Sequence, residues 1–345
     1  MKTFRSIPFR SLVAVTSLAV TASFFAACGS DESGPDLVVY SGRKEELIVP
    51  LMERFEKESG LDVEVRFGPD SAEFALQIDS EGDRGPDVFI SQSPGAMGFL
   101  DEQGRLVAID ESSIAGVPDE YHAADNHWVG TSARVRVLVY NTDNVTADEL
   151  PESVFDLTQD AFKGRVGVAP DNSSFIDFVT TLRDLEGDDA TGAFLEGLAA
   201  NGARDYADNH AILEAVARGE VDFGLINHYY NEQALLEVPD QPTANHLFAD
   251  GDPGSMILMT TVGILKTGED HRDAAEKLIS FMLNEESQTY FATETLEYPL
   301  VGGIERGLDG LPALNEIHAP TIDLASLGAK FKTTQKLISD SGLIG

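Results

Sequence analysis

The stretch DLVVYSGRKEELIVPLMERFEKESGLDVEVRFG, residues 36–68, decides the fold class. Residues 36–42 are rich in β-branched and aromatic side chains and end at a glycine, which predicts a strand. Apolar side chains then recur at helical spacing over 45–60, where another glycine predicts the end of a helix. The valine-rich run at 61–68 predicts a second strand. Strand, helix and strand in this order form a βαβ unit, so we expect an α/β fold.

The same alternation continues along the chain. Further strands are expected at 87–92, 134–141, 164–170, 221–227 and 256–265, and further helices over SAEFALQIDSEG, GAMGFLDEQG and roughly 174–186, 190–200, 210–219, 230–237 and 272–284. This order favours mainly parallel sheets. A chain of 345 residues is long for one hydrophobic core, so we expect two domains of roughly 100 to 200 residues each.

The N-terminus has the features of an export signal. Residues 1–27 combine three basic residues with an apolar run that is too short and too weakly apolar for a good membrane span. The run ends in Phe25-Ala26-Ala27-Cys28, which is similar to the lipobox of bacterial lipoproteins, so Cys28 is expected to become the lipidated first residue. The alternative is a plain secretory signal with an incidental cysteine. Residues 28–35 are polar and predict a tether.

Charge and cysteine content argue against an internal disulfide and against binding to nucleic acid or anionic membranes. Cys28 is the only cysteine, so the chain cannot form an internal disulfide. Removal of residues 1–27 takes away three positive charges and no negative ones, which lowers the net charge from −35 to −38. Such a surface repels nucleic acid and anionic membrane faces, and it is most simply a solubility device.

Neutral hydrogen-bonding residues follow the expected strands. Ligands of open α/β sheets bind at the carboxyl ends of strands, where loops enter helix N-termini. The residues at those ends are Tyr40-Ser41-Gly42-Arg43-Lys44, Ser91-Gln92-Ser93, Asp171-Asn172-Ser173-Ser174, Asp208-Asn209-His210 and Asn227-His228-Tyr229-Tyr230. Because this set is rich in amides and hydroxyls and poor in catalytic groups, it predicts a binding site.

Two adjacent tyrosines, Tyr229 and Tyr230, lie where a strand is expected to turn into a helix. Neighbouring side chains on a strand point to opposite faces, and a bend at 227–230 would let both phenols share one target. Phenolate oxygen is a hard anionic donor, suited to a hard cation such as Fe³⁺. A free tyrosine has a pKa of about 10, so a bound cation must displace its proton. The alternative is an aromatic pair that only packs at the start of the helix.

Longer segments match a known pattern, in order, from about residue 36 to the C-terminus. They read VVYSGRKEELIVPLMERFEKESGLDVEV, DVFISQSPGAMGFLDEQGRLVAI, WVGTSARVRVLVYNT, NHAILEAVARGEVDFGLINHYYNEQAL and DPGSMILMTTVGILKTGEDHRDAAEKLISFMLNEESQ, followed by EYPL. Together they resemble the ferric-ion-binding proteins of bacteria, the periplasmic or lipoprotein substrate-binding components of iron(III) ABC importers. The resemblance implies a type II periplasmic-binding-protein fold, a two-lobed Venus flytrap with the ligand cleft between the lobes.

The resemblance also implies roles for residues of the cleft. Tyr229 and Tyr230 would be phenolate ligands of Fe(III), the cargo, and Gln92 stands where some family members have a glutamate ligand. A synergistic anion, phosphate or carbonate, completes the coordination in many members. Here it would be held by Arg134, with Arg136 as a near alternative, and by Asn172, Ser173, Ser174, Asn209 and Asn227. A pocket rich in amides and hydroxyls at a helix N-terminus suits an oxyanion on physical grounds as well.

The chain departs from the family pattern in the first lobe. Where some members have a histidine, sometimes followed by a tyrosine, this sequence reads Lys44-Glu45. Gln92 is a neutral and weaker donor than the glutamate of other members. DNSSF, at 171–175, lacks a tyrosine that another subgroup carries there. Either anions or Glu45 would fill the gap, or the cargo is not bare Fe³⁺.

Lobe boundaries and cellular context follow from the same resemblance. One lobe would comprise 36–130 plus 260–310, and the other 137–255 plus 312–345. The protein would be exported and lipid-anchored to the outer face of the cell membrane, or periplasmic. It would be a monomer that delivers its cargo to an ABC permease and ATPase, and it would bind no nucleic acid.

Two other functions compete with iron capture. The same fold could bind an organic or phosphorylated anion, with the tyrosines stacking on it or donating hydrogen bonds to it. An enzyme is not expected, because HExxH, GxSxG and GxxxxGK[ST] are absent and the one cysteine is Cys28. The seven histidines show no ligand-like cluster in the sequence, although His228 adjoins the tyrosines.

Overall fold

A computed structural model describes residues 34–68, 70–304, 306 and 310–344. The expected signal sequence, Cys28 and all but the last two residues of the expected tether lie outside the described residues. We call Pro35–Gly345, which forms one compact unit, the body.

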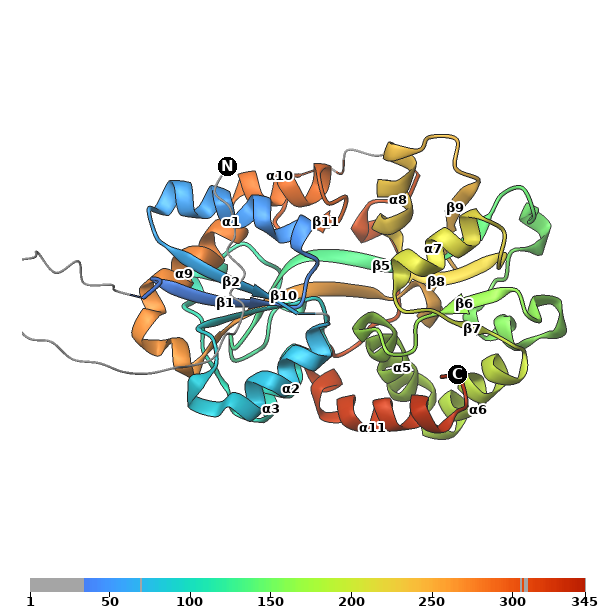
Figure 1. The fold of residues 1–345 in the computed structure, drawn as a ribbon, viewed down its shortest axis with the longest axis horizontal. Helices are drawn as coiled ribbons and strands as arrows, with labels where there is room; N and C mark the ends of the chain where they lie inside the picture. The colour runs from blue at the N-terminus through green and yellow to red at the C-terminus, as the bar shows by residue number, and fades with distance from the viewer. Residues whose placement is uncertain (1–33, 69, 305, 307–309, 345) are drawn as a thin grey trace, which may run out of the picture. The chain divides into compact units, whose positions relative to one another are not determined.

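Strands and helices alternate along the body (Figure 1). The strands are β1 (Leu37–Ser41), β2 (Val63–Phe67), β3 (Val88–Ser91), β4 (Leu106–Val107), β5 (Val129–Asn141), β6 (Val166–Val168), β7 (Arg204–Asp205), β8 (Phe223–Asn227), β9 (Thr243–His246), β10 (Ile257–Leu265) and β11 (Tyr298–Pro299). The α-helices are α1 (Glu45–Ser59), α2 (Ser71–Glu81), α3 (Pro94–Glu102), α4 (Glu111–Ile114), α5 (Ser173–Glu186), α6 (Asp188–Ala200), α7 (Asn209–Ala217), α8 (His228–Glu237), α9 (Arg272–Met282), α10 (Glu285–Thr293) and α11 (Leu327–Asp340).

The opening βαβ unit forms as the sequence predicts. The buried face of α1 consists of Leu47, Ile48, Leu51, Met52 and Phe55. Gly60 ends the helix with a φ of 71°, a left-handed conformation that favours glycine, and its N–H donates to the carbonyl of Glu56. β1 pairs in parallel with β2 on one side and with β3 on the other.

Two long strands join the two halves of the sheet. The strand order is β2-β1-β3-β10-β5-β8-β6-β7, with β9 and β11 paired to β5 and β4 paired to β10. β5 pairs with β10 up to Val135 and with β8 from Arg136 onward. We call β1–β4, β10 and β11 with helices α1–α4, α9 and α10 the first half, and β6–β9 with α5–α8 the second half.

The crossing strands correct one expectation. Mainly parallel sheets were expected, but β10 runs antiparallel to β3 and β5, and β5 runs antiparallel to β8. A chain that passes from one half to the other and back must run in both directions, so its crossing strands pair antiparallel. β5 also begins at Val129, before the expected start at Arg134. Its register against β10 shifts between Thr260 and Thr261, an irregularity of the kind that bends strands beside binding sites.

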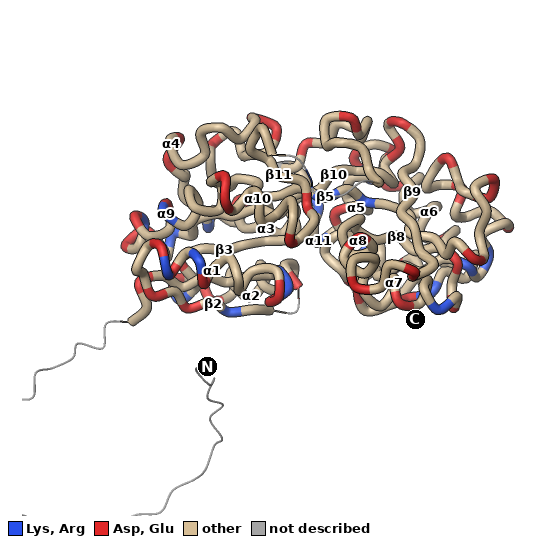
Figure 2. The backbone as a smooth tube through the Cα atoms, turned by 90° about the horizontal axis from the view of Figure 1, so that it is seen from above, with Lys and Arg blue, Asp and Glu red and all other residues tan. Residues whose placement is uncertain are grey.

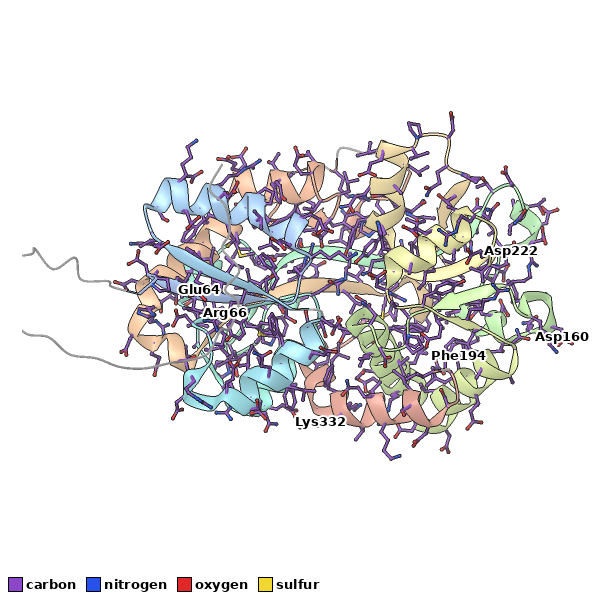
Figure 3. The ribbon with its side chains drawn as sticks, viewed as in Figure 1. Glu64, Arg66, Asp160, Phe194, Asp222 and Lys332 are labelled. Carbon is purple, nitrogen blue, oxygen red and sulfur yellow. The ribbon has the colours of Figure 1, made fainter. Side chains whose placement is uncertain are left out.

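Helix α11, which no local sequence pattern predicted, packs against both halves. It contacts α3 of the first half and α5 of the second, along the lower edge of the view in Figure 1. The approach to α3 is close, because a Cβ at Gly328 would lie 2.1 Å from the carbonyl carbon of Gly98. Lys332, labelled on α11 in Figure 3, places its ammonium 4.7 Å from the centroid of the Phe99 ring on α3.

Acidic residues are spread along the backbone of the body rather than gathered in one segment (Figure 2). Some form local pairs, such as Glu64 with Arg66 at 2.7 Å on β2 (Figure 3). Exposed pairs of this kind contribute little stability, so the excess of acid acts mainly on solubility. Within the described part of the chain, we find no helix long and apolar enough to cross a bilayer.

Candidate metal and anion site

The tyrosine pair lies buried at the junction of β8 and α8. β8 ends at Asn227 and α8 begins at His228, so the chain turns immediately before the pair. Tyr229 is fully buried and Tyr230 is 5% exposed. Their rings stack with centroids 4.4 Å apart and planes 26° apart. The bend therefore brings the two phenols to one place.

Burial keeps the phenol of Tyr230 neutral unless a cation is close. It raises the pKa of Tyr230 well above its usual value of 10, and the neighbouring Tyr229 raises it further. The Arg43 guanidinium and the Gln92 side chain act in the opposite direction. A bound metal ion would replace the phenolic protons, as metals generally do at ligands of high pKa.

Gln92 reaches the tyrosines from the first half. It follows β3, and its Nε2 donates to the Tyr229 hydroxyl at 3.4 Å. Its backbone N–H donates to Ser71 Oγ at 2.8 Å, and its carbonyl accepts from Arg134 Nη2. Rotation of the amide group by half a turn would present its oxygen to the phenols instead. Gln92 is thus held where a neutral ligand from the first half would stand.

His228 has a structural role. The Val135 N–H donates to its Nδ1 at 3.2 Å, so Nε2 carries the proton and donates to the Leu296 carbonyl at 3.0 Å. Burial, together with the Arg306 guanidinium, lowers the pKa of the imidazole well below 6.5. Because both ring nitrogens are occupied, His228 has no lone pair to offer a metal ion.

Arg43 supplies a fixed positive charge beside the phenols. It is 1% exposed, and its Nη1 and Nη2 donate to Glu297 at 2.6 and 2.8 Å. The guanidinium carbon lies 6.0 Å from the centroid of the Tyr229 ring. Such bidentate pairs have a defined geometry, so the charge is held in place. Sequence analysis located Arg43 at the end of an expected strand but predicted no role for Arg43 or Glu297.

The residues expected to hold an anion form one hydrogen-bonded group, except Ser173, whose Oγ is buried without a partner among the described residues. Asn209 Nδ2 donates to Asn172 Oδ1 at 3.2 Å, and Asn227 Nδ2 donates to Ser174 Oγ at 3.2 Å. Arg134 Nη2 also donates to Ser174 Oγ, at 3.4 Å. Asn172 caps α5 by accepting from the Ser174 N–H at 3.1 Å. The structure therefore brings these side chains together at the N-terminus of one helix.

Two arginines of β5 face this group without a carboxylate partner. Arg136 Nη1 donates to the side-chain oxygens of Asn209 and Asn227 at 3.4 and 3.3 Å. Among the described residues, neither arginine forms an ion pair, and Nε and Nη1 of Arg134 have no partner. Burial lowers the pKa of both, and with the Arg134 guanidinium it lowers that of Arg136 to about 9. Buried, unpaired cations are costly, so this location attracts an anion.

Lys44 and Glu45 depart from the family pattern, and only Lys44 lies near the tyrosines. The Lys44 ammonium is 5.5 Å from the centroid of the Tyr230 ring and 3.5 Å from the Asp208 carboxylate. Glu45 is exposed in the first turn of α1, and no contact among the described residues joins it to the tyrosines. Lys44, rather than Glu45, is therefore the residue of this pair that faces the site.

Two carboxylates in this region were missed in the sequence. Asp70 caps α2, and Asp177 lies within α5. Burial raises the pKa of Asp70, and it raises that of Asp177 to about 7. An aspartate before a helix is a recognisable capping signal. Nothing in the local pattern indicates the contacts that either residue makes with the other half.

Other polar features of the surface do not include the tyrosines. Asp101, Asp125 and His127 place their ligand atoms within 4.8 Å of one another, a cluster the sequence did not indicate. Exposed acidic groups of this kind are common without an ion. A surface pocket of about 570 Å³ is lined by residues 118, 120–121, 298–304, 306 and 311–315, none of which is a predicted ligand.

Comparison with known proteins identifies the family. The pattern of a family described as "Bacterial extracellular solute-binding protein" matches residues 83–323, well over half of the chain. The chain belongs to this family. Like its relatives, this solute-binding protein has the two-lobed periplasmic-binding-protein fold, which confirms the fold class and the resemblance predicted from the sequence.

Named relatives of this solute-binding protein bind ferric iron. It is 30% identical to the major ferric iron-binding protein of Neisseria meningitidis serogroup A, over 89% of this chain and 93% of the other. It is 29% identical to the Fe(3+)-binding periplasmic protein of Serratia marcescens, over 96% and 97% of the two chains. The structure of iron-bound HitA from Pseudomonas aeruginosa matches it with a TM-score of 0.82 at 30% identity, over 89% and 99%.

Proposed function

We propose that this solute-binding protein captures Fe(III) outside the cytoplasm, with the phenolates of Tyr229 and Tyr230 as ligands. The observation that carries the proposal is the buried, stacked pair of phenols beside the fixed guanidinium of Arg43. Phenolates are hard anionic donors, and a trivalent cation has the charge needed to displace tightly held protons. Relatives named for ferric iron binding support the same cargo.

A synergistic anion, phosphate or carbonate, would complete the site. Two phenolates neutralise two of the three charges of Fe(III), and two buried guanidiniums nearby have no carboxylate partner among the described residues. The N-terminus of α5 adds a further attraction for an anion. The anion would be held by Arg134, Asn172, Ser173, Ser174, Asn209 and Asn227. Gln92 would face the metal as a neutral ligand.

Capture of an organic or phosphorylated anion without iron is the second candidate. The two unpaired arginines favour it, because they would suit a phosphate or carboxylate whether or not a metal is present. A structure of AfuA from Actinobacillus pleuropneumoniae with fructose-6-phosphate shares the fold, with a TM-score of 0.75, but at 19% identity this likeness concerns the fold alone. The iron proposal uses the tyrosine pair as well, so we place it first.

The visible spectrum of the purified protein with added ferric citrate tests the proposal. Iron bound to phenolate gives a charge-transfer band, so the protein should become coloured, and more strongly when phosphate or carbonate is present. Colour that develops only with the anion would identify the anion as part of the site. A protein that stays colourless with both additions would favour the second candidate.

Attachment to the outer face of the cell membrane through Cys28 belongs to the same proposal. The apolar run and small residues before Cys28 are placed for lipoprotein processing. Cargo would then pass to an ABC permease and its ATPase, and the binding protein would act as a monomer. Cys28→Ala should release the protein from the membrane fraction. A variant that stays as firmly attached as the wild type would contradict the anchor.

The lobes would comprise 36–130 plus 260–310 and 137–255 plus 312–345. The change of pairing partner along β5 at Val135 and Arg136 supports a boundary there. Closure about such crossing strands is the usual motion of two-lobed proteins. Small-angle scattering with and without iron should show a smaller radius of gyration when iron is bound.

A further inference from the structure

Asp70 connects the N-termini of two helices, one in each half. Its Oδ1 accepts from the Ala72 N–H at 2.7 Å and so caps α2 of the first half. Its Oδ2 accepts from the N–H of Ser173 at 3.1 Å, and Ser173 is the first residue of α5 in the second half. One carboxylate therefore serves two donors with two different oxygens.

Asp177 makes the reciprocal connection. It lies on α5 of the second half, fully buried, and its Oδ1 accepts from Ser93 Oγ at 2.8 Å and from the Gly95 N–H at 3.3 Å. Ser93 is the N-cap of α3 in the first half. A Cβ at Gly95 would lie 2.5 Å from this oxygen, so a larger residue there would displace the carboxylate. Here one oxygen serves both donors.

Both contacts adjoin the proposed cargo site. Ser173 lies between Asn172 and Ser174 in the anion-binding group, and Ser93 follows Gln92. The first N–H groups of a helix have no partner within the helix and carry a partial positive charge, so a carboxylate placed there is stabilising. If the halves moved apart, α5 would lose the carboxylate of Asp70 and α3 would lose that of Asp177.

We propose that Asp70 and Asp177 are positioning residues, which hold the two halves in the arrangement that encloses the cargo. This inference rests on the proposed capture of Fe(III). Neither side chain need touch the metal. Their effect is on how long the halves stay together around it, and therefore on the rate at which iron leaves.

Asp70 uses both carboxylate oxygens and Asp177 uses only one, so replacement by asparagine should affect the two positions differently. Asparagine is a good N-cap, so Asp70→Asn should keep the bond to Ala72. Its single oxygen cannot also serve Ser173, so the contact between the halves should be lost. Asp177→Asn keeps the one oxygen that accepts both bonds, whereas Asp177→Ala removes it. A role that depended only on negative charge would make both asparagine variants defective.

Iron release from the loaded full-length protein into excess chelator tests this signature. Loss of these hydrogen bonds between the halves should speed release about tenfold in Asp70→Asn and Asp177→Ala. Asp177→Asn should remain within about twofold of the wild type. Asp252→Asn is the matched control, because Asp252 Oδ1 accepts from the N–H groups of Val154 and Gly254, and all three residues lie within one proposed lobe, in 137–255. The proposal would be overturned if Asp70→Asn released iron at the wild-type rate, or if Asp177→Asn and Asp177→Ala released it equally fast.

Amide hydrogen exchange at Ser173 provides a readout that does not need iron. The iron-free protein opens and closes, and the Asp70 carboxylate protects the Ser173 amide whenever the halves meet, so Asp70→Asn should accelerate exchange of that amide while exchange at Ala72 stays as slow as in the wild type. Unchanged exchange at Ser173 would contradict the cross-half contact. A wild-type protein that takes up no iron would refute the proposed function, and the exchange result would then decide this inference by itself.

Discussion

The rings of Tyr229 and Tyr230 stack with centroids 4.4 Å apart, although the two residues are neighbours in the chain. Neighbours on a strand point to opposite faces, and neighbours on a helix lie about 100° apart. The stacking is possible because the pair occupies the first turn of α8, directly after β8. The strand-to-helix junction thus brings together two groups that can both become anionic.

Iron affinity should fall as the pH falls. Burial raises the pKa of Tyr230 above 10, so the iron-free phenol keeps its proton at neutral pH and must release it on binding. If both phenols are protonated beforehand, the binding constant should fall roughly a hundredfold per pH unit. Chelator competition across about pH 6 to 8, corrected for protonation of the chelator, measures this slope. An affinity independent of pH would contradict phenolate ligation.

Lys44→Met should weaken iron binding modestly. The ammonium lies 5.5 Å from the centroid of the Tyr230 ring and favours a negative charge there, but the side chain is 31% exposed. Solvent screening limits the expected loss to about threefold, measured by iron titration with phosphate present. Lys57→Met, at the exposed far end of α1, is the control. If both variants lost the same affinity, Lys44 would have no specific role.

Asp177 should make the protein less stable as the pH rises. Burial raises its pKa from 3.8 to about 7, so between these values the native state binds more protons than the unfolded state. The free energy of unfolding therefore falls with rising pH across that window. Asp177→Asn removes this dependence. The free energy of unfolding of the variant, measured relative to the wild type, should therefore be higher at pH 8 than at pH 5 by at most about 3 kcal/mol. Denaturant unfolding of both proteins at pH 5 and pH 8 measures this difference. If the free energy of unfolding changed equally with pH in the wild type and the variant, the prediction would be wrong.

Gly328→Ala should disturb the contact between α11 and α3. The new Cβ would lie 2.1 Å from the Gly98 carbonyl carbon, and backbone atoms cannot yield as a flexible side chain can. Overpacking of this kind costs about 1 to 3 kcal/mol. At Gly192, on α6, the nearest atom to a Cβ is Leu337 Cδ1 at 3.7 Å, so Gly192→Ala should stabilise the helix by about 0.5 to 1 kcal/mol. Thermal unfolding of the two variants should therefore shift in opposite directions.

Local sequence patterns correctly predicted the features that depend on residues close together in the chain. The βαβ unit over 36–68, the bend before Tyr229 and the polar strand ends all follow from residues a few positions apart. The polar residues after successive strands were expected to lie close together because those strand ends meet at one edge of a sheet, whereas their role in holding an anion came from the resemblance. The resemblance supplied the choice of iron, which the residues alone left open against simple packing.

Contacts between distant segments could not be predicted in this way. Asp70 has the pattern of an N-cap, but its second bond depends on the approach of α5 from the other half. Asp177 lies in the middle of a helix with no motif around it. The antiparallel crossing strands depend likewise on how the two halves are connected, which no short window of sequence contains.

Iron titration of Tyr229→Phe and Tyr230→Phe, followed by the charge-transfer band with phosphate or carbonate present, tests the central claim most directly. Phenylalanine keeps the ring packing and removes one anionic ligand, so each variant should fold, lose most of its colour and bind iron far more weakly than the wild type. Folding is checked by thermal unfolding of the iron-free proteins. Wild-type affinity and colour in both variants would contradict ligation by the tyrosines.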